Sequence, residues 1–308
     1  MLVTGGAGFI GSHIVDRLLR EGYGVGVVDN LSTGNLTNIS GHVDCGSVDF
    51  VKGDVRDRDL VGKLVHNVYA VVHLAAVVSV PFSVENPDVT FDVNVEGTRG
   101  LLESCVRSGV KKFIFVSSCS VYGAPRYLPV DEVHPTCPIS PYAASKLKGE
   151  RCCQELVGRP DLDVVVLRLF NVYGPRQASG EYSGVITKFI DRARNGEPLV
   201  VYGDGSQTRD FVHVTDVANA VLALVKQQRA GDVFNIGYGK AVSINSLAKT
   251  VLGFSDYYCG IDYAPSRDGD IPHSVADSSK ARKAFSYVPK VGLKEGLRDL
   301  FQQMSVAR

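Results

Sequence analysis

The fold is decided by residues 2–11, which read Leu2-Val3-Thr4-Gly5-Gly6-Ala7-Gly8-Phe9-Ile10-Gly11. Residues 2–4 predict a short buried strand, and the residues from Phe9 onward predict a helix. Each glycine has a mechanical use: Gly5 permits a tight turn, Gly8 lets the backbone approach a pyrophosphate, and Gly11 lets the helix lie close to the sheet. A strand, a glycine-rich turn and a helix in this order predict a dinucleotide site.

An acidic residue follows these glycines at the spacing that such a site needs. Asp29 closes the run 24–28, about 20 residues after the glycines, where a carboxylate can accept both hydroxyls of an adenosine ribose. The same carboxylate would repel the 2′-phosphate of NADP, and residues 30–33 supply no cation for it, so the sequence favours NAD. A turn-capping role is the alternative for Asp29. Asp54 is a candidate for the adenine amino group or, equally, for a helix N-cap.

Short β-branched segments alternate with longer helical patterns through the first half of the chain. The expected strands are residues 2–4, 25–28, 50–51, 71–74, 113–116 and 164–169. This rhythm predicts βαβ units, and the continuous apolar runs predict helices on both faces of the sheet. We therefore expect an α/β fold with a Rossmann-type, doubly wound parallel sheet, whose ligands lie at the carboxyl ends of the strands.

After about Asn171 the pattern loosens into segments punctuated by glycine and proline, with helical stretches near 185–195 and 214–228. We expect residues 1–170 to form the NAD-binding domain and residues 171–308 to form mainly a smaller C-terminal α/β lobe that binds the substrate. Crossovers back to the first domain are expected at about 210–236.

Composition narrows the kind of partner. The 308 residues include 33 Lys and Arg and 33 Asp and Glu, so no basic surplus is available for a nucleic-acid backbone. Seven cysteines without C-x-x-C spacing and seven histidines without ligand spacing predict free thiols and no metal site. No apolar run approaches the roughly 20 residues of a membrane span. We expect a cytoplasmic protein that binds a small molecule and neither nucleic acid nor membrane.

Two segments place proton-transfer groups near the expected cofactor. The strand 113–116 runs into Ser118, which puts a hydroxyl at the carboxyl edge of the sheet. Some residues later, Ser140 suits a helix N-cap, so Tyr142 and Lys146 stand one turn apart on one helix face. An ammonium and a positively charged nicotinamide favour a tyrosinate, which can act as a base near neutral pH. An ordinary exposed helix pair is the alternative.

With these motifs the chain resembles the extended short-chain dehydrogenase/reductase family, and within it the UDP-glucose (UDP-galactose) 4-epimerases. The resemblance covers essentially the whole length and rests on residues 5–11, 29–30, 73–76, 94–98, 117–123, 142–146, 168–175, 209–214 and 267–270. The expected cofactor contacts are Gly5, Gly8, Phe9, Ile10, Gly11, Asp29, Asn30, Asp54, Val55, Leu74, Ala75, Ala76, Asn94, Ser117, Tyr142 and Lys146. Asn94 is expected to make hydrogen bonds on a helix surface near the cofactor.

The resemblance also implies the chemistry. In that family pattern Tyr142 is the catalytic base, Lys146 binds the nicotinamide ribose and tunes Tyr142, and Ser118 assists proton transfer. The implied substrate contacts are Ser118, Tyr142, Asn171, Arg209, Arg267 and Asp270. Two arginines and an amide suit a diphosphate, although plain surface charge is the alternative for each arginine. We predict reversible C4 epimerisation of UDP-galactose to UDP-glucose through a 4-keto intermediate with transient reduction of NAD.

Sugar-nucleotide 4,6-dehydratases and decarboxylases are the nearest competing enzymes. Dehydratases of the family carry Asp-Glu just before the Val-Tyr-Gly motif, whereas this chain has Cys119-Ser120, so the carboxyl that would donate a proton is missing. Epimerases of UDP-N-acetylhexosamines or UDP-uronates stay open. Ser274 occupies a place where some members have a bulky tyrosine, and a small residue there leaves room for an N-acetyl group.

Two further expectations concern catalysis and assembly. A non-catalytic NAD-binding protein on the same fold is disfavoured, because Ser118, Tyr142 and Lys146 form a complete proton-transfer set. The resemblance implies a homodimer that pairs through residues 90–108 and 142–157.

Overall fold

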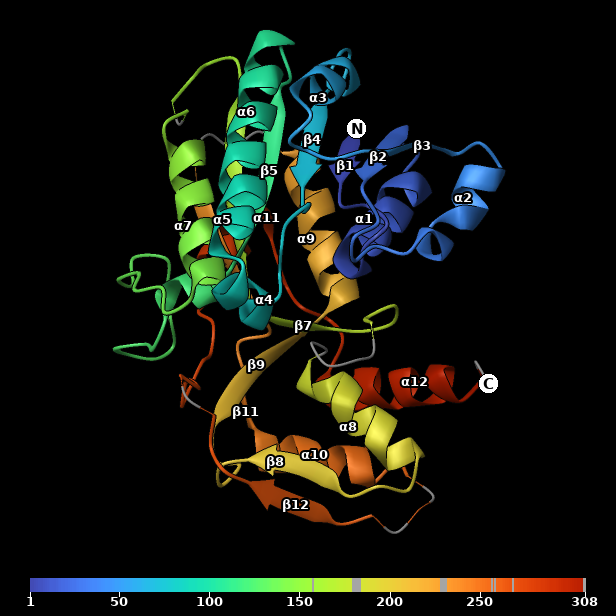
Figure 1. The fold of residues 1–308 in the computed structure, drawn as a ribbon, viewed down its shortest axis with the longest axis vertical. Helices are drawn as coiled ribbons and strands as arrows, with labels where there is room; N and C mark the ends of the chain where they lie inside the picture. The colour runs from blue at the N-terminus through green and yellow to red at the C-terminus, as the bar shows by residue number, and fades with distance from the viewer. Residues whose placement is uncertain are drawn as a thin grey trace.

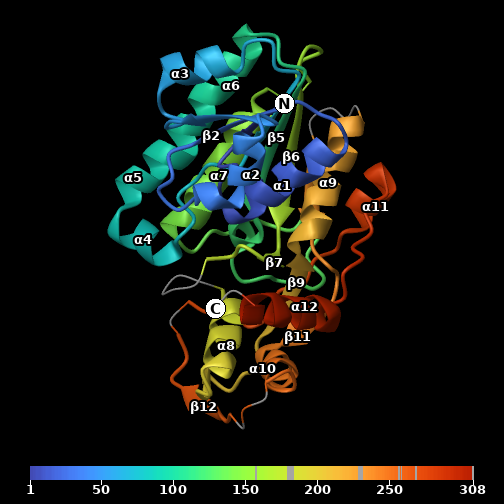
Figure 2. The same cartoon turned by 90° about the vertical axis from the view of Figure 1, so that its right-hand side faces the viewer.

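The computed structural model describes residues 1–306 except 157, 179–183, 228–231, 256, 258 and 268. A seven-stranded sheet with helices on both faces makes up the larger part, and short sheets and helices form a smaller lobe below it (Figures 1 and 2). The predicted α/β fold with a doubly wound parallel sheet is confirmed. Residue 228 of one expected helix, residue 157 of one expected dimer segment and Asp268 lie outside the described residues.

The large sheet has the strand order β10-β6-β5-β4-β1-β2-β3, and all neighbouring strands are parallel. Its strands are β1 (Leu2–Thr4), β2 (Val25–Asp29), β3 (Val48–Lys52), β4 (Ala70–His73), β5 (Lys112–Ser118), β6 (Asp163–Leu169) and β10 (Asp232–Ile236). The sequence did not predict β10 as a strand, because polar residues interrupt its apolar pattern. The structure shows that one of these polar residues, Asn235, is fully buried. The order reverses between β1 and β4, where a ligand crevice is expected.

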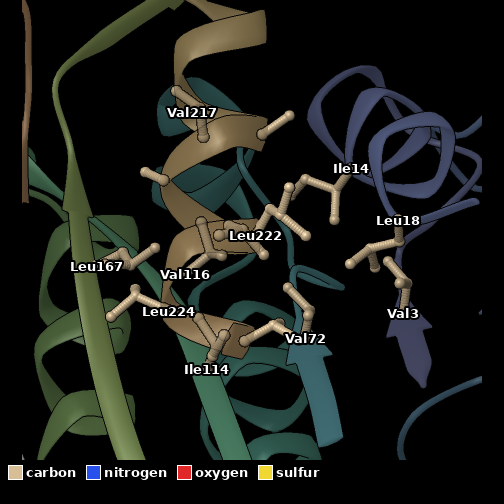
Figure 3. Close-up of a cluster of buried hydrophobic side chains, with 14 of the residues drawn as sticks. Val3, Ile14, Leu18, Val72, Ile114, Val116, Leu167, Val217, Leu222 and Leu224 are labelled. Carbon is tan, nitrogen blue, oxygen red and sulfur yellow. The ribbon is translucent and has the colours of Figure 1, made fainter. Parts of the chain in front are cut away.

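Apolar side chains cover both faces of this sheet. Helices α1 (Phe9–Arg20), α9 (Val214–Lys226) and α11 (Ser279–Phe285) pack on one face. Figure 3 shows Leu222 and Leu224 of α9 beside Val72, Ile114 and Leu167 of the strands. Helices α3 (Arg58–Leu64), α6 (Gly97–Arg107) and α7 (Pro141–Gln154) pack on the other face. Each fully buried Val or Leu contributes about 1.5–3 kcal/mol, so the strand ends form a rigid platform for a site.

The smaller lobe is built from short strands and three packed helices. Strand β9 (Thr208–His213) lies between β7 (Asn171–Tyr173), to which it is parallel, and β11 (Ala241–Ser243), to which it is antiparallel. Strands β8 (Leu199–Tyr202) and β12 (Ile261–Ala264) form a second pair, next to α8 (Val185–Arg194), α10 (Ile244–Leu252) and α12 (Leu293–Val306). Between these elements the chain returns to the large sheet with α9 and β10. The boundary at residue 170 stays a prediction.

A buried lysine, Lys112, fixes the N-terminal end of β5 to α9. Lys112 is 1% exposed, and its ammonium donates to the Leu224 carbonyl oxygen at 2.7 Å and pairs with Asp163 at 2.7 Å. It thus caps the C-terminal end of α9, where carbonyl groups lack helical partners. Lys112 lies at the opposite end of β5 from Ser118.

Candidate active site

The glycine-rich turn has the backbone shape that a dinucleotide requires. Gly5 has φ +70°, and a Cβ there would lie 2.8 Å from the Ala75 backbone nitrogen; a Cβ on Gly11 would overlap the Gly5 carbonyl oxygen. No side chain caps α1 at its N-cap residue Gly8, and its first turn holds no acidic residue. The N–H groups of this turn are therefore available to an anion, so these residues fit the pyrophosphate of NAD.

Asp29 braces the turn from the end of β2. It is 7% exposed, and its carboxylate accepts hydrogen bonds from the backbone N–H groups of Ala7 at 3.0 Å and Leu31 at 2.8 Å. The bond to Leu31 is the turn-capping contact that the sequence left as an alternative. Each carboxylate oxygen can accept more than one hydrogen bond, so the contact leaves room for a ribose hydroxyl, and that role stays a prediction.

Asp54 does not cap a helix. Asp57 is the N-cap of α3 and accepts a hydrogen bond from Leu60 N–H at 3.0 Å, so the N-cap interpretation of Asp54 is wrong. Asp54 instead accepts from the Arg56 guanidinium at 2.9 Å and from Asn30 Nδ2 at 3.0 Å, and the Arg56 interaction lowers the pKa of Asp54. The neighbouring Val55 is 5% exposed and packs beside α6. Asp54 and Asn30 are thus held side by side at the ends of β2 and β3.

The segment after β4 is locked by a buried histidine and a threonine. His73 is 1% exposed, and its ring nitrogens lie 2.7 Å from Thr4 Oγ1 and 2.9 Å from Thr98 Oγ1. Thr4 Oγ1 also accepts from the N–H groups of Leu74 and Ala75. Burial lowers the pKa of His73 to about 3, so the ring is neutral and works as a structural link. The ends of β1 and β4, with the expected cofactor contacts 74–76, are therefore held together.

Asn94 lies inside the protein, so its expected position on a helix surface is wrong. It is 1% exposed and lies in a π-helical turn, η2 (Asp92–Glu96), an irregularity that is frequent at functional sites. Its Oδ1 accepts from Val77 N–H at 2.7 Å, and its Nδ2 donates to the Val77 carbonyl oxygen and to Ser145 Oγ, each at 2.9 Å. A direct contact of Asn94 with NAD stays a prediction.

The residues predicted for proton transfer lie at the carboxyl end of β5 and in the first turns of α7. Ser140 is the N-cap of α7, as predicted. Burial raises the pKa of the half-buried Tyr142 to about 12, and hydrogen bonding with the Ser118 hydroxyl opposes this rise. Lys146 is 4% exposed and donates to the Val116 carbonyl oxygen at 2.9 Å. Burial lowers the pKa of Lys146 to about 8, and the carboxylate of Glu150 opposes this fall.

The burial of Lys146 decides between the two interpretations of Tyr142 and Lys146 given by the sequence. A lysine that is 4% exposed is not part of an exposed helix pair, so that alternative is wrong. A charged ammonium beside a phenol favours the phenolate, and a positive nicotinamide would favour it further. Ser118 begins the catalytic turn, residues 118–122, where its hydroxyl accepts from Ser120 N–H at 3.2 Å.

Four of the expected substrate residues, Asn171, Arg209, Arg267 and Asp270, lie on the smaller lobe. Arg209 on β9 forms an ion pair with Asp270 and has a side chain that is 15% exposed, so it is not plain surface charge. The charges of Arg209 and Asp210 both act on the pKa of the Cys119 thiol, so β9 lies near the catalytic turn. Arg267 is exposed and stacks 3.7 Å over the Tyr202 ring. Asn171 lies on β7, in register with Phe211 of β9.

A buried polar network behind α7, the helix that carries Tyr142 and Lys146, was not predicted from the sequence. It joins Glu150, Arg168, Ser117, Tyr122 and Asn235 by hydrogen bonds. Two features of the sequence indicate this network: Arg168 interrupts an apolar strand, and Glu150 follows Lys146 by one helical turn. Ser117, an expected cofactor contact, donates its hydroxyl to Glu150 at 2.5 Å, and its contact with NAD stays a prediction.

The described residues show two further absences. Within them no helix is long and apolar enough to cross a membrane. In the same part of the chain no group of three His, Cys, Asp or Glu side chains is placed to hold a metal ion.

With this geometry, the comparison with known proteins gives the class of enzyme. The chain belongs to the NAD dependent epimerase/dehydratase family, whose model matches residues 1–237. It is therefore an enzyme of that family, and its cofactor is NAD.

Three relatives show the range of reactions among similar proteins. A putative UDP-glucose 4-epimerase of Methanocaldococcus jannaschii is 41% identical over 306 residues, which cover 99% of this chain and 98% of the relative. The structure of a UDP-N-acetylglucosamine 4-epimerase from Methanobrevibacter ruminantium, in complex with UDP-N-acetylmuramic acid, has a TM-score of 0.95 and 37% identity, covering 100% and 98% of the two chains. A dTDP-glucose 4,6-dehydratase from Streptomyces venezuelae with NAD bound has a TM-score of 0.92 and 32% identity, covering 100% and 97%.

Proposed function

We propose that this protein is a UDP-glucose 4-epimerase that interconverts UDP-galactose and UDP-glucose. The observation that carries the proposal is the meeting of Ser118, Tyr142 and the buried Lys146 at the sheet edge that also holds the glycine turn. The name of the Methanocaldococcus jannaschii relative supports the same reaction.

The proton at the sugar 4-hydroxyl is handled by the chain's own residues. NAD, when bound, supplies reversible oxidation at the carbon that bears this hydroxyl. Tyr142 takes the proton and later returns it, while Lys146 keeps a positive charge beside the phenolate and holds the nicotinamide ribose. Ser118 hydrogen-bonds to the reacting hydroxyl and fixes its direction. The Ser118 hydrogen bond already lowers the pKa of Tyr142, and a bound, positively charged nicotinamide would lower it further and so favour removal of the proton.

The UDP part is held by the smaller lobe, so that the sugar alone can turn over. Arg209 and Arg267 grip the diphosphate, and Asn171 and Asp270 contact the rest of the nucleotide. Guanidinium groups suit this work, since each binds phosphate oxygens with two parallel hydrogen bonds. A diphosphate competes with Asp270 for Arg209, because these two side chains pair directly.

Dehydration is disfavoured by the catalytic turn. Burial raises the pKa of the Cys119 thiol to about 12, so it stays protonated and is a poor general acid or base at neutral pH. Ser120 has a hydroxyl in place of a carboxyl. Elimination of water needs an acid and a base next to carbons 5 and 6, and neither side chain supplies them.

The test is to incubate the purified protein with UDP-galactose and NAD, and to resolve the nucleotide sugars by chromatography. We expect UDP-glucose to appear without net reduction of NAD. A 4-keto-6-deoxy sugar would mean that the argument from Cys119 and Ser120 is wrong. Conversion only of UDP-glucuronate would move the proposal to a uronate epimerase.

A second substrate is favoured by Ser274. This residue is 8% exposed, and its N–H donates to the Thr208 carbonyl oxygen at 3.1 Å, next to Arg209. Because its side chain is small, we expect the enzyme also to convert UDP-N-acetylglucosamine. Ser274→Tyr is expected to lose this activity and to keep that toward UDP-galactose. Equal effects on both sugars would show that Ser274 does not set the choice.

Self-association is proposed through helices α6 and α7. A groove between them is lined by Leu102, Val106 and Leu156, with Arg99, Glu103 and Glu155 at its edges. A two-fold axis brings equal patches together, so opposite charges on one patch can pair with those on its copy. Light scattering is expected to give the mass of two chains, and Val106→Glu the mass of one. A single-chain mass for the unaltered protein would rule the dimer out.

A further inference from the structure

A buried ion pair between Glu150 and Arg168 lies behind α7, and no step of the proposed reaction uses it. Glu150 is fully buried, and Arg168 is 5% exposed. Arg168 Nη2 donates to Glu150 Oε2 at 2.6 Å, and Arg168 Nε donates to Oε1 at 3.0 Å. The Ser117 hydroxyl donates to the same Oε1 at 2.5 Å. This carboxylate therefore joins α7 to the ends of the neighbouring strands β5 and β6.

The remaining nitrogen of the guanidinium, Nη1, makes a hydrogen bond to the catalytic turn. Arg168 Nη1 donates to the Tyr122 phenol oxygen at 3.0 Å, and the Tyr122 hydroxyl donates to Asn235 Oδ1 at 2.7 Å. Tyr122 is 1% exposed and is the last residue of the short 3-10 helix η3 (Cys119–Tyr122). The N-cap of η3 is Ser118. The position of Ser118 is thus tied to Arg168 through three residues of helix.

One guanidinium therefore contacts both elements that carry the proton-transfer groups. It reaches α7 through Glu150, one turn beyond Lys146, and it reaches the catalytic turn through Tyr122. A buried ion pair is weak evidence for stability, because apolar residues of equal size often serve as well. Its geometry is specific, however, since the planar guanidinium fixes the directions of all its partners.

We propose that Arg168 is a positioning residue that sets the separation between Tyr142 on α7 and Ser118 on the catalytic turn. The kinetic part of this inference rests on the proposed function. Reaction rates depend steeply on such separations, because a misplacement of about 1 Å lowers a rate by about 100-fold. The groups that act on the Tyr142 phenol are the Ser118 hydroxyl and the Cys119 thiol of the turn, and Lys146 lies one helical turn further along α7.

Three variants separate positioning from stability. Tyr122→Phe removes the hydroxyl and its hydrogen bonds to Arg168 and Asn235, and it keeps the ring, which lies 4.8 Å from the guanidinium, so little packing is lost. Arg168→Met removes both links. Lys112→Met is the matched control, because it removes another buried charge from the same sheet, at the end of β5 opposite to Ser118.

Two measurements are made on the folded, NAD-loaded variants. The first is the pH titration of the tyrosinate absorbance, with the Tyr142→Phe signal subtracted so that only Tyr142 is seen. Loss of the Ser118 hydrogen bond is expected to move this titration up by about one pH unit in Tyr122→Phe and Arg168→Met, since one unit corresponds to about one hydrogen bond. The second is steady-state turnover of UDP-galactose, where kcat is expected to fall by about 10- to 100-fold with KM little changed.

Lys112→Met is expected to lower the melting temperature while leaving the Tyr142 titration and kcat unchanged. If Tyr122→Phe and Arg168→Met fold and keep both the wild-type titration and the wild-type kcat, Arg168 is not a positioning residue. If Arg168→Met does not fold, Tyr122→Phe decides alone. The titration needs no sugar, so a protein that titrates as stated and converts no UDP-sugar would refute the proposed function and leave the positioning role intact.

Discussion

Tyr142→Phe is expected to lower kcat for UDP-galactose by at least about 100-fold, because a positioned acid and base contributes about 10²- to 10⁴-fold to such a step. Phenylalanine keeps the ring and removes the phenol that accepts the proton. The expected UDP contacts are not changed, so KM is expected to stay within a few-fold of the wild-type value. Steady-state kinetics with both UDP-sugars measures the effect.

The matched control for this variant is Tyr69→Phe. Tyr69 is 48% exposed and precedes β4, at the opposite edge of the sheet from the site. Loss of its hydroxyl is expected to leave kcat unchanged. A Tyr142→Phe enzyme that turns over within a few-fold of wild type would show that another group moves the proton.

Gly11→Ala is expected to weaken NAD binding by about 10- to 100-fold. A methyl group on Gly11 would overlap the Gly5 carbonyl oxygen and approach Gly6 Cα to 2.8 Å, so α1 must move away from the turn. Such overpacking costs about 1–3 kcal/mol, and about 1.4 kcal/mol is a factor of ten in affinity. The helix N-terminus that is expected to bind the pyrophosphate moves with it. Titration calorimetry with NAD measures the loss.

Gly62→Ala is the control for the glycine variant. Gly62 lies in α3, and a Cβ there meets nothing within 4 Å. NAD affinity is expected to stay at the wild-type value, and the helix is expected to be slightly more stable because alanine is the better helix former. Equal NAD affinity for Gly11→Ala and wild type would show that the turn tolerates displacement or that NAD binds elsewhere.

The sequence predicted those parts of the protein that depend on local patterns. The glycine turn, the strands β1, β2, β4, β5 and β6, and the N-cap at Ser140 all follow from residues close together in the chain. Strand β10 was not predicted because Asp232 and Asn235 interrupt its apolar pattern, and the hydrogen-bond partner of Asn235 is a tyrosine more than a hundred residues away. Distant pairings of this kind leave no local signal.

Side-chain partners were predicted less well than backbone elements. The sequence offered Asp54 as a helix cap, but Asp57 lies three residues before Leu60, whose N–H it accepts, and therefore caps α3. Asn94 was placed on a helix surface, because a regular helical repeat does not anticipate a π-turn. The sequence predicted Lys146 as a partner of Tyr142 in proton transfer, with an ordinary exposed helix pair as the alternative. Only the fold shows that it is buried beside the end of β5.

The central claim is that the residues at this sheet edge carry out reversible oxidation at C4 of a UDP-sugar. The most direct measurement uses UDP-galactose that carries deuterium at C4, with the product UDP-glucose analysed by mass spectrometry and NMR. The account predicts that the deuterium is retained at C4 of UDP-glucose, because the atom removed from one face of the carbon is returned to the other. Loss of the deuterium to water, or its appearance at C6 of a deoxy sugar, would contradict it.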